Sequence, residues 1–376
     1  MDSVQLNELL QLLRQQNGGV VLQKDGKSEA VLLSIDRYYQ LLEKQQDNQI
    51  QARDKALIKK LTVLVTGGAG YIGAHIVRQL LKKGHQVIVV DNFVTGKREF
   101  VPKEATLVEG SIGDRDVLDL AFSGRGVDVV MHLAASIEAP ESCREPFSYF
   151  ENNVIATHTL LQAMKEHSVP KIIFSSSASV YGDLVSVPTD ENQKLQPDDP
   201  YGHTKLLGEK IIEFYTANSS LQATILRYFN VCGVDPNSEL YDTHNESKIV
   251  PIILEVAYGK REKFIVYGND FDTFDGTCIR DYIHVMDVVQ AHILALENPG
   301  NEPLRIYNVG TGKGYSVEQM VSTAAEVLNR MIPLEIGPRR AKDVSTSIAD
   351  NTKITKELGF KAEYSDLETI FKTSKI

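Results

Sequence analysis

Short apolar runs alternate with longer amphipathic stretches along most of the chain after Thr62. Runs such as TVLVT (62–66), QVIVVD (86–91) and KIIFSSS (171–177) are rich in β-branched residues, whereas stretches such as 71–83 repeat their apolar residues at helical spacing. A compact apolar run predicts a buried strand, and a 3.6-residue period predicts a helix. We therefore expect an α/β fold in which a Rossmann-type, doubly wound parallel sheet has helices on both faces.

The rhythm loosens after Gly233, where FDGT and several prolines mark loops, and helical periodicity resumes later in DVVQAHILAL and SVEQMVSTAAEVL. This change predicts a sheet domain over residues 61–232. Residues 233–376 are expected to form mainly a smaller α/β lobe, with residues 278–298 returning to the first domain.

The first 60 residues do not follow this scheme. A helix-like QLNELLQLLRQQ precedes a hairpin signal through Lys24-Asp25-Gly26-Lys27, and a polar, Gln-rich stretch follows. We expect a small α+β N-terminal module over residues 1–45 and a helical linker over 46–60. The order of helix, hairpin and SIDRYYQLLE resembles the N-terminal half of prevent-host-death type antitoxins, which implies DNA or toxin binding. Residues 1–60 hold 8 acidic and 9 basic residues without a basic patch, which disfavours DNA.

Charge and cysteine content narrow the class of protein. The net charge of −10 argues against holding nucleic acid or an anionic membrane through the overall field. The N-terminus lacks a basic segment leading into an apolar one, and no run approaches a membrane span, so we expect a cytoplasmic protein. Cys143, Cys232 and Cys278 lie outside any CxxC or Cys/His cluster, so neither a disulfide framework nor a metal site is predicted.

The string VTGGAGYIG (65–73) joins the first predicted strand to the helix that follows. Gly67, Gly70 and Gly73 allow a tight turn and a close approach to a pyrophosphate, which helix N-termini favour. Asp91 ends the second strand, where a carboxylate accepts from a ribose 2′-hydroxyl and repels a 2′-phosphate. The pattern predicts NAD rather than NADP as cofactor.

A serine cluster and a Tyr-x-x-x-Lys pair predict the catalytic centre. KIIFSSS ends at Ser177, and Tyr201 and Lys205 lie four residues apart at the start of the next long helix. Parallel sheets bind ligands beyond the carboxyl ends of their strands, so the three side chains can converge there. We expect the Lys205 ammonium and the positive nicotinamide together to lower the pKa of the Tyr201 phenol, which then acts as the base with Ser177 as accessory group. The plainer alternative is that Tyr201 and Lys205 are exposed neighbours on a helix, and that the serines only complete the hydrogen bonding at the end of their strand.

These features, together with SSSASVYG, RYFNVCG (227–233) and DGTCIRDYIHVMDV (275–288), resemble the extended short-chain dehydrogenase/reductase family. Within that family the similarity is to UDP-hexose 4-epimerases, over about residues 61–370. It implies an NAD-binding domain, a substrate-binding lobe and interconversion of UDP-glucose and UDP-galactose through a 4-keto intermediate, with Tyr201 as base. A homodimer built on helices 145–167 and 200–217 is also implied.

The resemblance assigns residues to each ligand. Around the NAD it places the three glycines with Tyr71, Ile72, Asp91, Asn92, Leu133, Ala134, Asn152, Tyr201, Lys205 and Phe229. On the UDP-sugar side it places Ser177, Asn230, Lys248, Ile249, Val266, Tyr267, Arg280, Arg340 and Asp343. The basic members supply the cations that a diphosphate requires despite the negative net charge. His132 and His284 lie within apolar strings, and we interpret both as structural.

Other activities remain open at this point. Related dehydratases carry an Asp-Glu pair after the strand-end residue, and Ala178 and Ser179 stand there in this chain, which disfavours dehydration. A nucleotide-sugar decarboxylase remains an alternative. Ser347 stands where some members carry a bulky tyrosine, so an N-acetyl group could fit and UDP-GlcNAc is a further candidate substrate. A UDP-pentose is another alternative. A regulatory protein directed by residues 1–60 is the third class of hypothesis.

Overall fold

The computed structural model describes residues 20–24, 27–32, 60–182, 186–242, 248–340 and 343–375. The chain divides into a first unit, Met1–Lys59, and a second, Lys60–Ile376. In the first unit, β1 (Val20–Lys24) pairs antiparallel with β2 (Lys27–Leu32), so the hairpin expected there is present. The remaining expectations for the module, and the linker up to residue 59, lie outside the described residues.

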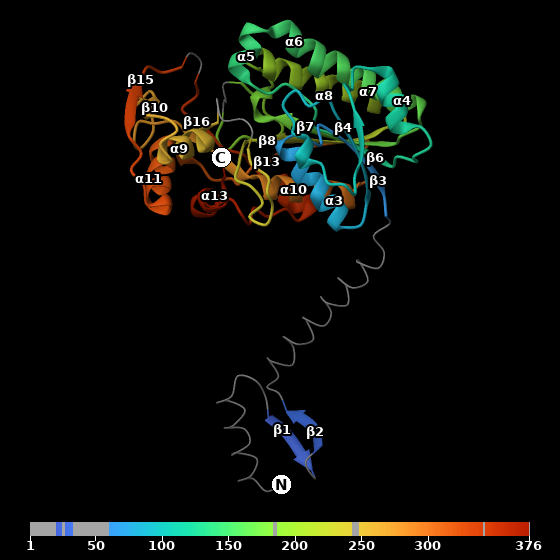
Figure 1. The fold of residues 1–376 in the computed structure, drawn as a ribbon, viewed down its shortest axis with the longest axis horizontal. Coiled ribbons are helices and arrows are strands. Elements are labelled where there is room, and N and C mark those ends of the chain that lie inside the picture. The colour runs from blue at the N-terminus through green and yellow to red at the C-terminus, as the bar shows by residue number, and fades with distance from the viewer. Residues whose placement is uncertain are drawn as a thin grey trace. The chain divides into compact units, whose positions relative to one another are not determined.

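A seven-stranded parallel sheet forms the larger part of the second unit (Figure 1). Its strands are β3 (Thr62–Thr66), β4 (Gln86–Asp91), β5 (Thr106–Glu109), β6 (Val129–His132), β7 (Lys171–Ser177), β8 (Gln222–Tyr228) and β13 (Leu304–Val309). The spatial order is β13-β8-β7-β6-β3-β4-β5, so the direction of winding reverses between β3 and β6. This reversal is the switch point at which open α/β sheets bind ligands, and it confirms the predicted Rossmann-type sheet.

Helices cover both faces of the sheet, as the apolar strands require. One face packs against α3 (Tyr71–Lys82), α10 (Val285–Glu297) and α12 (Thr352–Leu358), and the other against α4 (Arg115–Phe122), α7 (Ala156–Glu166) and α8 (Pro200–Asn218). Along β3, Val63 and Val65 belong to the first core and Leu64 to the second, because successive side chains of a strand point to opposite faces. All three are fully buried.

Short helical segments shape the ends of the strands. Between β6 and α7 the chain forms α5 (Ala139–Arg144), α6 (Pro146–Phe150) and a π-helical turn, η2 (Glu151–Ile155), a turn that often marks functional sites. Two 3₁₀ turns, η1 (Arg98–Phe100) and η3 (Ala178–Val180), follow β4 and β7. Helix α8 begins at Pro200 because Asp199 caps it, accepting from the Gly202 backbone N–H at 2.7 Å.

The smaller lobe is a mixed α/β layer with its own apolar core. It contains α9 (Ile249–Ala257), β10 (Phe264–Tyr267), β11 (Ile279–Arg280), β14 (Tyr315–Ser316), α11 (Val317–Leu328), β15 (Leu334–Gly337), β16 (Thr346–Ser347) and α13 (Leu367–Thr373). β10 pairs with β15, and β11 lies between β14 and β16. A parallel pair, β9 (Asn230–Cys232) and β12 (Tyr282–His284), runs alongside the end of β8.

The C-terminal half of the chain returns to the sheet over more residues than 278–298. Helix α10, which lies within that range, packs on α3. Strand β13 also pairs with β8, and α12 contributes Ile354 and Leu358 to the same core, although both elements follow residue 298. The periodicity of β13 alone does not distinguish a seventh sheet strand from a strand of the lobe, because pairing partners are not encoded locally.

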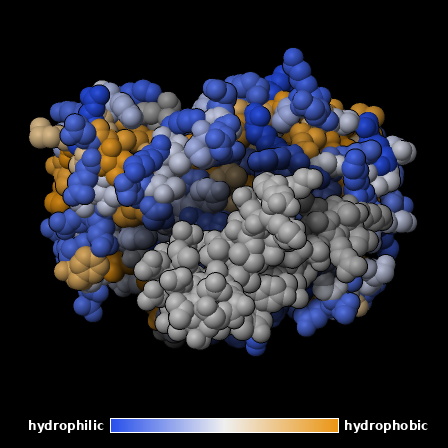
Figure 2. Space-filling view, turned by 90° about the horizontal axis from the view of Figure 1, so that it is seen from below, coloured by the Kyte–Doolittle hydropathy of each residue, from blue (hydrophilic) through white to orange (hydrophobic). Residues whose placement is uncertain are grey.

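The surface of the described residues is mainly hydrophilic in the view of Figure 2, with smaller hydrophobic areas between charged side chains. Among the described helices, none combines the length and the apolar character needed to cross a membrane.

Candidate active site

A cavity of about 760 Å³ lies where the carboxyl ends of the strands meet the smaller lobe. It is lined by all three glycines of the predicted phosphate loop, by Ser177, Tyr201 and Lys205, and by most of the remaining predicted residues. Those others are Tyr71, Ile72, Asp91, Asn92, Leu133, Ala134, Asn152, Phe229, Asn230, Lys248, Ile249, Tyr267, Arg280, Arg340 and Asp343. The fold therefore brings residues from 67 to 343 to one site.

Val266 is the exception among the predicted residues. Strand β10 alternates, so Val266 points into the core of the smaller lobe while Ile265 and Tyr267 point outward and line the cavity. The Val266 side chain therefore does not line the described cavity, and its expected place on the UDP-sugar side stays a prediction. Of the other β10 residues, Ile265 and Tyr267 line the cavity from the opposite face of the strand, and Phe264 lines it as well.

The loop between β3 and α3 has the geometry of a phosphate cradle. Gly67 adopts φ +69°, and a Cβ there would lie 2.7 Å from the Ala134 nitrogen of the adjoining strand end. Gly70 is the N-cap of α3 and offers no side chain to its first turn, so the helix N-terminus faces the cavity without a side-chain cap. Backbone N–H groups in this setting favour an anion such as a pyrophosphate.

Asp91 lies at the end of β4 beside this cradle. Its carboxylate oxygens accept backbone hydrogen bonds from Ala69 and Phe93, both at 2.9 Å. Burial raises the pKa of Asp91, and these two hydrogen bonds oppose the rise. A carboxylate has about four lone-pair sites, so Asp91 can still accept from ribose hydroxyls. The cradle and this acceptor together fit the pyrophosphate and adenosine ribose of NAD.

Three side chains predicted to be catalytic converge beside the cradle. Ser177 ends β7, and Tyr201 lies in the first turn of α8 and hydrogen-bonds Ser177. The Lys205 Nζ donates to the Ser175 carbonyl oxygen at 2.9 Å and lies 5.9 Å from the centroid of the Tyr201 ring. Phenol, hydroxyl and ammonium thus face one cavity, which makes an acid/base centre.

Burial is the largest influence on the pKa of Tyr201 in this structure. Burial raises the pKa of Tyr201 to about 12, and the hydrogen bond with Ser177 opposes this. Burial lowers the pKa of Lys205 to about 8, against the opposing field of Glu209. The Lys205 ammonium donates to the Ser175 carbonyl oxygen, and its effect on the phenol, together with that of the positive nicotinamide, stays a prediction. The chain by itself therefore holds Tyr201 as a neutral phenol.

Cations from the smaller lobe also face the cavity. Arg280 forms an ion pair with Asp343, and Arg340 stacks 4.1 Å from the centroid of the Tyr267 ring. Lys248 lies 3.1 Å from an Asp242 carboxylate oxygen and 4.5 Å from the centroid of the Tyr71 ring. Guanidinium and ammonium groups in such a pocket suit a diphosphate.

Both histidines singled out in the sequence are engaged internally. The His132 ring nitrogens hydrogen-bond the hydroxyls of Thr66 and Thr157, each at 2.8 Å, and burial lowers its pKa to about 3. His284 caps α10 by accepting from the Met286 N–H, and burial lowers its pKa to about 4. Both rings are neutral at pH 7 and hold elements in place, in line with a structural role.

Several cavity residues had no sequence signal strong enough to single them out. Glu138, Glu141 and Glu145 bring carboxylates to the cavity wall, and Arg261 and Lys263 precede β10. The basic run around Lys263 was a usable signal, since it directly precedes a predicted strand. The carboxylates fall in a polar helical stretch, where only the tertiary structure shows which side chains face the cavity.

Comparison with known proteins agrees with this geometry. Residues 63–310 match the NAD dependent epimerase/dehydratase family. A UDP-glucose 4-epimerase of Halalkalibacterium halodurans is 45% identical over 312 residues, which cover 82% of this chain and 93% of that protein.

Two solved structures show the same fold. The UDP-glucose 4-epimerase of Brucella ovis in complex with NAD is 38% identical, with a TM-score of 0.80, and the match covers 84% of this chain and 97% of that one. The enzyme of Bifidobacterium longum in complex with NAD+ and UDP is 36% identical, with a TM-score of 0.78, covering 83% and 96%. With the matched family spanning most of the described sheet and a relative this similar over most of both chains, the chain belongs to the NAD dependent epimerase/dehydratase family.

Proposed function

We propose that this chain interconverts UDP-glucose and UDP-galactose by epimerisation at C4, with NAD as cofactor. The observation that carries the proposal is the convergence of Ser177, Tyr201 and Lys205 beside a phosphate cradle, in one cavity with Arg280 and Arg340. The similarity to UDP-glucose 4-epimerases along most of the chain supports the same activity.

The residues divide the work of proton transfer and binding. Ser177 hydrogen-bonds the sugar 4-oxygen, and Tyr201 takes the 4-hydroxyl proton and later returns it to the same oxygen. Lys205 holds the strand end on which Ser177 lies by donating to the Ser175 carbonyl. When bound, NAD supplies the acceptor for the C4 hydride and the positive charge that favours the Tyr201 phenolate. Proton and hydride both return to the sugar, so no net oxidation occurs.

The remaining activities have less support. Ala178 and Ser179 form η3 directly after Ser177, so this position carries no additional acid and base for dehydration. Ser347, the basis of the UDP-GlcNAc candidate, is paired in β16 and is not among the cavity-lining residues that the structure describes. UDP-hexoses are therefore the substrate class that the site favours.

One assay tests the activity and the choice of sugar. Purified protein is incubated in parallel with UDP-galactose, UDP-GlcNAc and UDP-arabinose, and products are separated by chromatography. We expect UDP-glucose from UDP-galactose and no loss of water or CO2. Failure to convert any of the three sugars, with NAD present, would overturn the proposed function.

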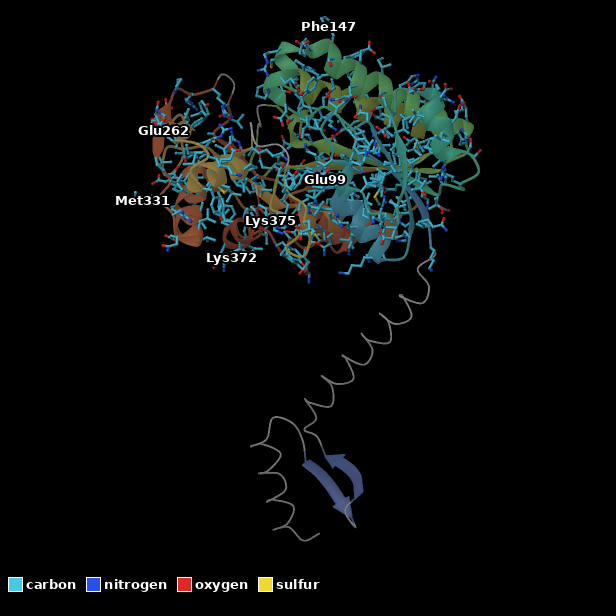
Figure 3. All side chains as sticks on the ribbon, viewed as in Figure 1. Glu99, Phe147, Glu262, Met331, Lys372 and Lys375 are labelled. Atoms are coloured by element: carbon cyan, nitrogen blue, oxygen red, sulfur yellow. The ribbon has the colours of Figure 1, made fainter. Side chains whose placement is uncertain are left out.

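The proposed enzyme is a homodimer built on the helices expected from the sequence. Helices α6 and α8 lie together on one side of the sheet and carry exposed aromatic side chains, including Phe147, which is 85% exposed, and Phe214, which is 66% exposed. Figure 3 shows Phe147 projecting from α6 away from the sheet. Burial of such large apolar side chains against a second copy would stabilise the pair.

A further inference from the structure

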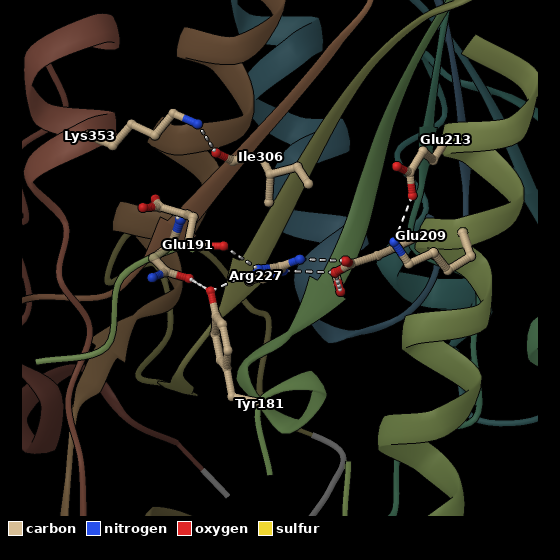
Figure 4. A network of polar contacts seen from close by, with 10 residues as sticks. Tyr181, Glu191, Glu209, Glu213, Arg227, Ile306 and Lys353 are labelled. Carbon is tan, nitrogen blue, oxygen red and sulfur yellow. Dashed lines mark hydrogen bonds and ion pairs between the residues drawn. The ribbon is translucent and has the colours of Figure 1, made fainter. Parts of the chain in front are cut away.

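A buried ion pair joins α8, the helix that carries Tyr201 and Lys205, to strand β8. Glu209 and Arg227 are 3% and 1% exposed, and their two hydrogen bonds run from Arg227 Nε to Glu209 Oε1 at 2.9 Å and from Nη2 to Oε2 at 2.6 Å. Arg227 Nη1 also donates to the Tyr181 hydroxyl at 2.9 Å (Figure 4). The arginine on β8 thus holds the carboxylate of α8 in a fixed orientation.

Helix α8 uses this carboxylate to contact the strand that carries the accessory serine. The Ser176 hydroxyl donates to Glu209 Oε1, and Lys205, four residues earlier on α8, donates to the Ser175 carbonyl oxygen. Two adjacent residues of β7 are therefore bound by two side chains one helical turn apart. Tyr201 lies one further turn toward the N-terminus, on the same face.

We propose that Glu209, held by Arg227, is a positioning residue that keeps Lys205 in place and charged beside Tyr201. This inference rests on the proposed function, which gives Tyr201 and Lys205 their roles. A buried ammonium in an apolar setting tends to lose its proton, and a nearby carboxylate opposes this. Glu209 is the first acidic residue after Lys205 on the inward face of α8, so its carboxylate is placed to act on the ammonium.

The other groups that the structure describes around Lys205 do not supply the same charge. On its own helix Tyr201 is a phenol, and from β6 His132 is neutral. From β7 come the Ser175 carbonyl and the Phe174 ring, whose centroid lies 5.3 Å from Nζ. Arg227 on β8 is a cation, and its guanidinium is hydrogen-bonded to the Glu209 carboxylate. Removing the Glu209 charge therefore lowers the pKa of Lys205, and the uncompensated Arg227 adds to that effect.

The test uses Glu209→Gln, which keeps the shape of the side chain, and the double variant Glu209→Gln/Arg227→Met, which removes both charges. Competitive labelling of amines with acetic anhydride across pH, analysed by mass spectrometry of the peptide containing Lys205, measures the ionisation of Lys205 without requiring turnover. We expect the inflection to move to lower pH by about one unit in the single variant and by less in the double variant. An unchanged inflection in both would overturn the proposal.

Turnover of UDP-galactose provides the second measurement. In Glu209→Gln we expect kcat to fall roughly tenfold or more. As pH rises, kcat should decline at a lower pH than in the wild type, whereas KM should stay within about twofold of the wild-type value. Asp287→Asn is the matched control, since Asp287 is a buried carboxylate of α10 outside the cavity. It should lower the melting temperature without moving either pH profile.

The outcomes separate the two proposals. If the wild type does not epimerise but the labelling inflection moves as expected, the proposed function fails and the positioning role stands. If Glu209→Gln does not fold, the double variant, in which Arg227 is not left as an unpaired buried cation, carries the test. A loss of kcat in Asp287→Asn equal to that in Glu209→Gln, with no pH shift in either, would show that Glu209 acts only through stability.

Discussion

Replacement of Gly73 by alanine tests the geometry of the phosphate cradle most directly. A Cβ at this third residue of α3 would lie 2.1 Å from the Gly67 carbonyl oxygen and 2.9 Å from the Gly68 Cα. The first distance is more than ~1 Å short of ordinary van der Waals contact. Both obstacles are backbone atoms, and the same Gly67 oxygen accepts from the Gly70 N–H at 3.1 Å, so the turn must open for the helix to remain packed.

The size of the effect follows from this overlap. Overpacking of a close contact costs about 1–3 kcal/mol or more, and a domain of this size loses about 2–4 °C of melting temperature per kcal/mol. We expect Gly73→Ala to melt roughly 3–10 °C below the wild type and to retain less NAD, measured by thermal unfolding and by absorbance of the cofactor released on denaturation.

Gly70→Ala is the matched control within the same motif. Its Cβ would lie 3.3 Å from the nearest atom, and φ −79° with ψ 174° is open to alanine. We expect a melting temperature within about 2 °C of the wild type, although a methyl group at the helix N-terminus can still reduce NAD binding. A Gly73→Ala protein with wild-type melting temperature and NAD content would refute this account of the cradle.

Three further predictions address the base, the dimer and a buried histidine. Tyr201→Phe should lower turnover of UDP-galactose by roughly 10²–10⁴ and leave the amount of copurified NAD unchanged; full activity would exclude Tyr201 as the base. Phe147→Asp combined with Phe214→Asp should yield a monomer in light scattering, whereas Phe274→Asp, at a residue 70% exposed on the smaller lobe, should leave the dimer intact; the same mass for both variants would argue against this interface. His132 is neutral in the folded protein with a pKa of about 3, below its unfolded value, so its contribution to stability should be lost as pH falls below about 6.5, at about 1.4 kcal/mol per pH unit; urea unfolding at pH 7 and pH 5.5 that shows no decrease would contradict this.

The sheet and its principal site motifs could be predicted from the sequence because both depend on local patterns. The apolar runs that form β3 and β4 and the spacing of Gly67, Gly70 and Gly73 are visible in short windows. Strand ends in a parallel sheet share one edge, so placing Ser177 and Asp91 there required only the order of the elements. The hairpin between β1 and β2 was visible for the same reason, in its turn residues.

Other features depended on contacts between distant segments. The outward or inward direction of Val266 follows from where β10 packs, and the place of β13 follows from its pairing with β8. The pKa of Tyr201 in the folded chain also depends on such contacts, because burial governs the phenol and the Lys205 ammonium donates to the Ser175 carbonyl.

The sequence by itself therefore determined the fold class and predicted the cofactor cradle and the candidate centre of Ser177, Tyr201 and Lys205, because secondary-structure periodicity and turn chemistry act over a few residues. Only the tertiary structure decided the charges around that centre. Desolvation and ion pairing, such as that of Glu209 with Arg227, arise when side chains far apart in the chain are brought together and removed from water.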